Sequence, residues 1–168
     1  RGLEDSAYNQ RIEECSQALS IIQDHYDVEH ICSINTEELL KIKSDFKDPI
    51  IYKRAHHAVS ENERTLLSSK VLKEGNVEAF GKLLNESHLS LKNDYEVSSK
   101  ELDCLVENAW LEEGVLGARL TGAGFGGCAI AIIEDKYKEQ IIKNVSEKYL
   151  EEIGYEADFY IAEIGPGL

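Results

Sequence analysis

The segment from Thr121 to Ile133 limits the fold most tightly, because a glycine-rich turn separates two stretches with strand character. It reads TGAGFGGCAIAII, and four of the six residues 122–127 are glycine. Val115 to Leu120 before the turn and Cys128 to Ile133 after it are rich in residues that favour strands. Glycine tolerates positive φ, so it suits a sharp reversal of the chain. We therefore predict a β-hairpin with the glycines at its turn.

The spacing of Gly122, Gly124 and Gly127 matches G-x-G-x-x-G letter for letter, but its context argues against a dinucleotide site. In that fingerprint the glycines lead into a helix whose N-terminus faces the pyrophosphate. A Walker A loop is also excluded, since Cys128 and Ala129 stand where Lys and Ser or Thr are required. Two interpretations remain: a plain hairpin turn, or a backbone wall whose N–H groups converge on an anion.

Length and charge narrow the class of protein. The 168 residues fit one domain, and 18 basic against 32 acidic side chains give a formal charge of −14. This balance argues against nucleic acid and anionic membranes as partners, and no apolar run approaches the roughly 18 residues of a membrane span. His25, His30 and Cys32 have no fourth ligand at motif spacing, so we expect no metal site. The four cysteines lack a C-x-x-C pair, which indicates free thiols and a cytoplasmic location.

Apolar periodicity predicts one α+β domain over residues 1–168. Helical spacing dominates residues 5–93, with an expected capping box at Asn35 and a glycine stop at Gly75. Residues 94–163 instead alternate strand and helix patterns, with outer strands expected at Tyr95 to Val97 and Ala157 to Ala162. The order β-α-β-β-α-β predicts a ferredoxin-like split βαβ part behind a helical N-terminal half.

Several sequence blocks resemble one enzyme family. GARLTGAGFGGCAIAII (Gly117 to Ile133) resembles the third signature motif of the galactokinase family, in the GHMP small-molecule kinase superfamily. DSAYNQRIEEC, RAHHAVSENERT and ESHLSLKNDYEVS resemble segments of that family in the same order and at similar spacing. The resemblance covers nearly the whole chain and implies a GHMP kinase C-terminal domain. The family's sugar signature, phosphate loop and reaction-centre Asp and Arg have no counterpart here, so we expect the N-terminal catalytic lobe to be absent.

The resemblance implies an activity for the whole enzyme. Such an enzyme transfers the γ-phosphoryl group of ATP, with Mg²⁺, to the anomeric hydroxyl of α-D-galactose, giving galactose 1-phosphate. This chain would supply no catalytic residue and no metal ligand, would hold no tightly bound cofactor, and would be inactive alone. Its expected partners are the N-terminal lobe, galactose and ATP. Self-association through the uncovered inter-lobe surface is a further expectation.

The resemblance also implies roles for particular residues. Tyr8, in DSAYNQR, is expected at the galactose pocket, and the alternative is that it belongs to an apolar helix stripe. Arg119 is expected to be a cleft cation, and the alternative is a salt bridge at the strand edge. The turn is expected to lie near the transferred phosphate and consists of Gly122, Ala123, Gly124, Phe125, Gly126 and Gly127.

Two other functions stay open at this stage. One is a non-catalytic, acidic, ferredoxin-like module that binds a small ligand or regulates another protein. The other is a related GHMP sugar kinase, such as an N-acetylgalactosamine kinase, because such enzymes resemble much of the same pattern.

Overall fold

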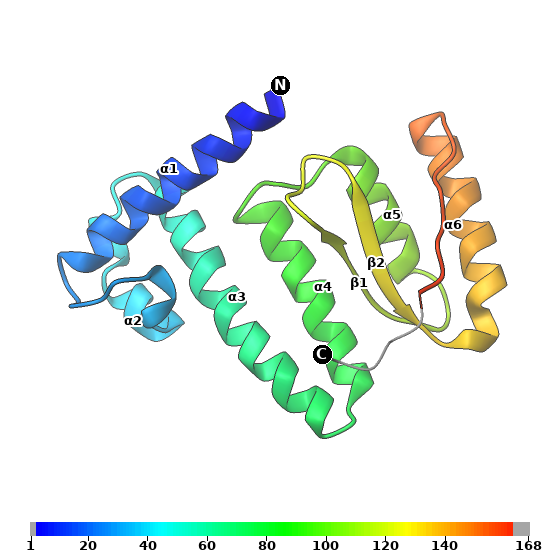
Figure 1. Ribbon diagram of the computed structural model, residues 1–168, viewed down its shortest axis with the longest axis horizontal. Coiled ribbons are helices and arrows are strands. Elements are labelled where there is room, and N and C mark those ends of the chain that lie inside the picture. Colours follow the sequence, from blue (N-terminus) through cyan, green and yellow to red (C-terminus); the bar gives the residue numbers. More distant parts are fainter. Residues whose placement is uncertain (1–2, 163–168) are drawn as a thin grey trace.

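The computed structural model describes residues 3–162 as an α+β structure. In Figure 1, α1, α2 and α3 form one group, while α4, α5 and α6 surround a β-hairpin. Single 3₁₀ turns lie at Ile31–Ser33, Lys43–Asp45 and Asp135–Tyr137. The elements are α1 (Leu3–Gln23), α2 (Thr36–Lys41), α3 (Pro49–Lys73), α4 (Val77–Asn93), α5 (Lys100–Trp110), β1 (Val115–Thr121), β2 (Cys128–Ile133) and α6 (Lys138–Ile153).

Local capping signals determine where several helices begin and end. The predicted capping box is present at α2, where Asn35 accepts from the Glu38 amide and the Glu38 carboxylate accepts from the Asn35 amide. The Asp48 side chain caps α3, and Pro49 occupies its first turn. The predicted stop at Gly75 is confirmed, because α3 ends at Lys73 and Gly75 has φ +73°.

Three apolar clusters hold these elements together, and the third contains Leu91 of α4 and Leu120 of β1. The first joins α1, α2 and α3 through buried residues that include Ile22, Leu39 and Val59. The second joins α5, α6 and the hairpin, with Val106 and Val145 at its centre. Among the described residues, no helix is both long and apolar enough to cross a bilayer.

The hairpin is packed against α4 at backbone distance. A Cβ atom on Gly81 would lie 2.1 Å from the Leu116 carbonyl oxygen, and one on Gly117 would lie 2.1 Å from the Gly81 carbonyl oxygen. Only residues without side chains allow this approach. The contact fixes β1 on α4 and thereby fixes the position of the turn that follows β1.

The predicted hairpin is confirmed. β1 and β2 are antiparallel, with Leu120 opposite Ala129 and Thr121 opposite Cys128, and an irregularity lies between Val115 and Gly117. This register places residues 122–127 in the connection between the strands.

The predicted outer strands are not found. At Tyr95 to Val97, Glu96 has φ +55°, which interrupts an extended backbone, and this segment makes one hydrogen bond to the turn instead of a ladder. Ala157 to Ala162 also has no strand structure: Tyr155 packs on Tyr149 of α6, and Figure 1 draws the following residues back along α6. The described sheet is therefore two-stranded, and the ferredoxin-like arrangement is not confirmed. Residue 163 of the predicted region lies outside the described residues.

Candidate functional site

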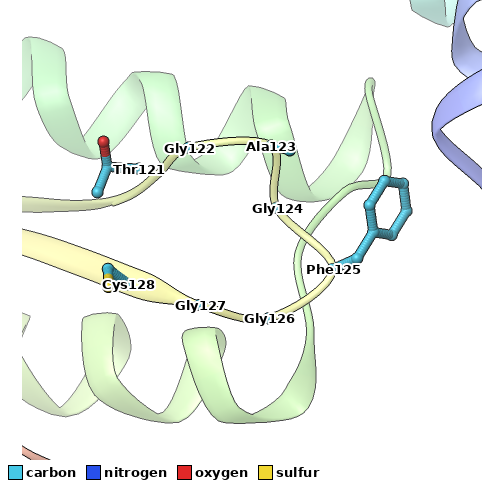
Figure 2. A pocket seen from close by; sticks show the side chains of 8 residues that line it. All are labelled: Thr121, Gly122, Ala123, Gly124, Phe125, Gly126, Gly127 and Cys128. Atoms are coloured by element: carbon cyan, nitrogen blue, oxygen red, sulfur yellow. The ribbon is translucent and has the colours of Figure 1, made fainter. Parts of the chain in front are cut away.

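A shallow hollow lies at the hairpin turn and is lined by Thr121 to Cys128 (Figure 2). Gly122 (φ +85°) and Gly127 (φ +92°) have left-handed backbone with open space where a Cβ would stand. Figure 2 shows that Thr121 and Cys128 stand where the turn meets the strands, so its middle has mostly main-chain atoms to offer. Main-chain N–H groups in such conformations bind anions. The turn is therefore suited to an anionic group that approaches the backbone closely.

The turn is held from one side by the segment that precedes α5. The Phe125 amide donates to the Val97 carbonyl oxygen at 2.6 Å, although Phe125 has the unfavourable φ of +61°. The Phe125 ring packs against the apolar cluster that contains Val97, Leu102 and Leu120. A Cβ on Gly124 would lie 2.2 Å from the same Val97 oxygen. The conformation of the turn therefore depends on the position of Val97.

Helix α1 lies against the same segment. Arg11 Nε donates to the Tyr95 carbonyl oxygen at 2.7 Å, and Arg11 Nη2 donates to the Glu96 carbonyl oxygen at 3.2 Å. Tyr8 precedes Arg11 by three residues, so the two share a helix face, and the Tyr8 side chain is 53% exposed. In Figure 2 the Phe125 ring points away from the strands, toward the side where a helix with the colour of α1 appears. Helix α1 and the turn therefore both contact the segment of residues 95–97.

The chemistry of Tyr95 reflects this packing. Burial, with the neighbouring Cys15, raises the pKa of Tyr95 to about 12, and Tyr8 acts in the same direction. The Cys15 thiol lies 3.9 Å from the Tyr95 hydroxyl. The half-buried Tyr95 is therefore packed between α1 and the segment before α5.

A buried ionic network supports α1 at this point. Glu14 Oε2 accepts from Arg11 Nη1 at 2.7 Å and from Arg54 Nε at 2.6 Å. Arg54, which is 1% exposed, also donates to the Asp94 carbonyl oxygen at 2.5 Å and to Glu96 Oε2 at 2.8 Å. Burial acts to raise the pKa of Glu14, but the hydrogen bond and charge of Arg54, together with Arg11, hold that pKa below its ordinary value. The network is charged and joins α1, α3 and the segment before α5.

Arg119 contacts residues of α3 and α4. Its Nη1 lies 3.1 Å from Glu61 Oε1 and 2.7 Å from Ser87 Oγ, and its Nε donates to the Leu120 carbonyl oxygen at 2.9 Å. These contacts tie β1 to α3 and α4. Arg119 and Glu61 form an ion pair between β1 and α3.

Two histidines are buried on α3 and α4. His88 is fully buried, and its Nδ1 accepts from the Leu120 amide at 3.2 Å. His57 Nδ1 lies 3.0 Å from Ser90 Oγ, and its ring stacks on Tyr95 at 4.5 Å. Burial lowers the pKa of His57 to about 4, so the ring is neutral near pH 7.

Sequence reasoning missed the Arg11, Glu14 and Arg54 network. Those charged side chains belong to ordinary helical patterns, and such residues usually face solvent. The available signal was that Arg11 and Glu14 lie in the block around Tyr8, while Arg54 opens RAHHAVSENERT. Within residues 3–162, no group of three or more His, Cys, Asp and Glu side chains forms a metal centre.

A family model, related protein sequences and a solved structure all match this chain, and all three indicate the same family. The family described as GHMP kinases C terminal matches residues 68–151, which is half of the chain. The chain is 50% identical to a galactokinase of Clostridium perfringens (strain SM101) and 47% identical to one of Fusobacterium nucleatum, over 99% of its length. It spans 43% of the length of each of these relatives.

A solved structure agrees with the sequence comparisons. The crystal structure of Lactococcus lactis galactokinase complexed with galactose matches with a TM-score of 0.94 and 46% identity. That match covers 99% of this chain and 43% of the other.

Proposed function

The chain belongs to the GHMP kinase C-terminal family, and from that premise we propose that it forms the C-terminal part of a galactokinase. The whole protein then transfers the γ-phosphoryl group of ATP to the anomeric hydroxyl of α-D-galactose, giving galactose 1-phosphate. The observation that carries the proposal is the continuous similarity to galactokinases over 99% of the chain, at 46–50% identity. Partial matches to a widespread fold would not extend so evenly.

In this proposal the glycine turn forms the phosphate side of the cleft. Phosphoryl transfer depends on positioning the acceptor in line with the γ-phosphate and on stabilising the charge that spreads over its oxygens. Gly122, Ala123, Gly124, Gly126 and Gly127 contribute backbone N–H donors and close approach, while Phe125 fixes the turn to its support. The turn has no charged side chain, so any neutralising cation comes from elsewhere.

Tyr8 forms the sugar side of the same cleft. It is half exposed near the start of α1, and its phenol offers one hydroxyl and an apolar ring to a hexose. We assign Arg119 to the support of β1, because Glu61 and Ser87 occupy its guanidinium. The catalytic groups belong to the N-terminal lobe, which is the proposed partner of this chain.

ATP and Mg²⁺ differ in how well they suit the residues that line the hollow. The phosphates of ATP suit the left-handed backbone of the turn, where N–H donors are available. Mg²⁺ requires carboxylate oxygens or phosphate oxygens with water, and the lining of the hollow contains no carboxylate. We therefore propose that ATP contacts this chain and that the protein ligands of Mg²⁺ lie in the N-terminal lobe. A cytoplasmic location is part of the same proposal, and the free cysteines support it.

The test is a phosphorylation assay on the full-length protein. MgATP with galactose should give ADP at ordinary kinase rates of roughly 1–100 s⁻¹, whereas the isolated chain should give none. N-acetylgalactosamine, used in parallel, should be a poor substrate. Faster turnover of N-acetylgalactosamine would assign the protein to that related kinase, and turnover by the isolated chain would refute the assignment of catalysis to the other lobe. Sedimentation of the isolated chain tests the further proposal of self-association, which a strict monomer at high concentration would contradict.

A further inference from the structure

A short series of contacts lies between the helix that carries Tyr8 and the glycine turn. Arg11 binds the Tyr95 and Glu96 carbonyl oxygens, and the next residue, Val97, accepts the Phe125 amide of the turn. Arg11 is 8% exposed and lies one helical turn after Tyr8. The contacts that connect α1 with the segment supporting the turn therefore include the buried guanidinium of Arg11.

Resting on the proposed function, we propose that Arg11 is a positioning residue that sets Tyr8 relative to the glycine turn. It contacts neither substrate in this proposal. It donates hydrogen bonds to the backbone carbonyl oxygens of residues 95 and 96. These bonds fix the distance between the helix that binds the sugar and the turn that faces the phosphate.

The shape of the guanidinium suits this task. All three of its nitrogens donate hydrogen bonds: Nη1 to the Glu14 carboxylate, Nε to the Tyr95 carbonyl oxygen and Nη2 to the Glu96 carbonyl oxygen. Arginine presents its donors in a rigid plane, whereas a lysine ammonium is a single point on a flexible stem. Lysine at this position would keep the charge beside Glu14 but lose the fixed fork.

Two neighbours hold the guanidinium in place. Glu14 is 7% exposed and is shared with Arg54, and Arg54 in turn binds the Asp94 carbonyl and the Glu96 carboxylate. Backbone and side-chain groups of residues 94–96 are thus bound by two arginines from two helices. A shift of α1 would have to disturb the contacts of Arg11 with residues 95–96 and the contact of Glu14 with Arg54.

Arg11→Lys in the full-length protein tests the proposal by steady-state kinetics. A misplacement of about 1 Å can reduce catalysis by about 100-fold, so we expect the galactose KM to rise at least about tenfold and kcat to fall. Glu13→Gln, an exposed change on the same helix, should leave both values within about twofold. A role in folding alone would lower the active fraction, and hence the apparent kcat, at an unchanged KM.

A double variant tests whether Arg11 acts through Tyr8. If it does, the effects are not additive, and Tyr8→Phe with Arg11→Lys should have a galactose KM within about twofold of Tyr8→Phe alone. Independent multiplication of the two effects would overturn the proposal, as would an unchanged galactose KM in Arg11→Lys.

Hydrogen exchange gives a readout that needs no activity. In Arg11→Lys the Phe125 amide should exchange at least about tenfold faster, because an opening that costs about 1.4 kcal/mol less is tenfold more populated, while α6 amides stay unchanged. Unchanged Phe125 exchange would overturn the proposal even if the variant were too unstable for kinetics. Absence of galactose phosphorylation in the wild type would instead reject the proposed function, and the exchange result would still decide whether Arg11 holds the turn.

Discussion

Arg54 Nε lies 2.6 Å from Glu14 Oε2, and this contact joins α1 and α3 across 40 residues of sequence. Both side chains are buried, so neither charge has water as an alternative partner. Removing one member of a buried ion pair usually costs more than the pair contributes, because the remaining charge stays in a poor solvent. The relationship therefore makes a sharp prediction about stability.

Arg54→Met should lower the free energy of unfolding by about 3–5 kcal/mol, since it leaves Glu14 partly uncompensated. Lys53→Met is the matched control from the neighbouring position. It breaks only the half-exposed Lys53–Glu96 pair, so we expect a loss of less than about 1 kcal/mol. Urea unfolding followed by circular dichroism measures both values. Equal losses in the two variants would show that the buried Arg54–Glu14 pair contributes no more to the free energy of unfolding than the half-exposed pair does.

The buried His57 makes stability depend on pH. Burial lowers its pKa from 6.5 to about 4, so between these values the unfolded chain binds a proton that the folded chain does not. Stability attributable to His57 is therefore complete above pH 6.5 and falls as the pH drops toward 4, by up to about 1.4 kcal/mol per pH unit.

His57→Phe should remove this slope while keeping a ring on Tyr95. The slope to compare is the difference in unfolding free energy between wild type and variant, because the lowered pKa of His88 adds a slope of the same sign to both proteins. Glu61 and Asp94 oppose the shift of His57, while Arg64 and Arg119 add to it. Unfolding curves at pH 7, 6 and 5 measure the slope. A variant with the same slope as wild type would contradict the assignment.

The contact between α4 and β1 predicts unequal costs for two glycine substitutions. Gly117→Ala places a Cβ against the Gly81 backbone and should cost about 3 kcal/mol through overpacking. Gly75→Ala meets no atom within 4 Å and should cost about 1 kcal/mol, from its positive φ alone. Thermal unfolding of both variants gives the comparison. A Gly117→Ala variant no less stable than Gly75→Ala would mean that the helix and strand can separate freely.

Two glycines of the turn form a natural matched pair. Gly122 and Gly124 have similar φ values of +85° and +81°, but only a Cβ on Gly124 would strike the Val97 carbonyl. Gly124→Ala should therefore release the Phe125 amide from Val97, whereas Gly122→Ala should add only backbone strain of about 1 kcal/mol. Hydrogen exchange at Phe125 reports the difference. Similar exchange in the two variants would argue against Val97 as the support of the turn.

Local sequence patterns were sufficient for most helices and for the hairpin. Glycines between two apolar strand segments, the Asn35 capping box and the Gly75 stop each act within a few residues, so the sequence alone predicts them. The proposal that the glycine turn lies near the phosphate required the family resemblance, because residue types do not show where backbone N–H donors point.

Long-range contacts account for what the sequence did not predict. The positive φ of Glu96 occurs where Arg11 and Arg54 bind that residue, and those partners lie 85 and 42 positions away. No local pattern indicates that Tyr95 to Val97 is bound in this way instead of pairing as a strand. Arg119 is similar, since its partner Glu61 lies 58 positions away on α3. The expected outer strand at Ala157 to Ala162 is also not found, and the Tyr155 just before it packs on Tyr149 of α6.

The proposed reaction is tested most directly by the identity of the product. Phosphorus NMR of the full-length protein with galactose and MgATP should show a new phosphomonoester coupled to the anomeric proton of the sugar. Absence of that signal while ATP is intact, or coupling of the phosphorus to the C6 protons, would contradict the account.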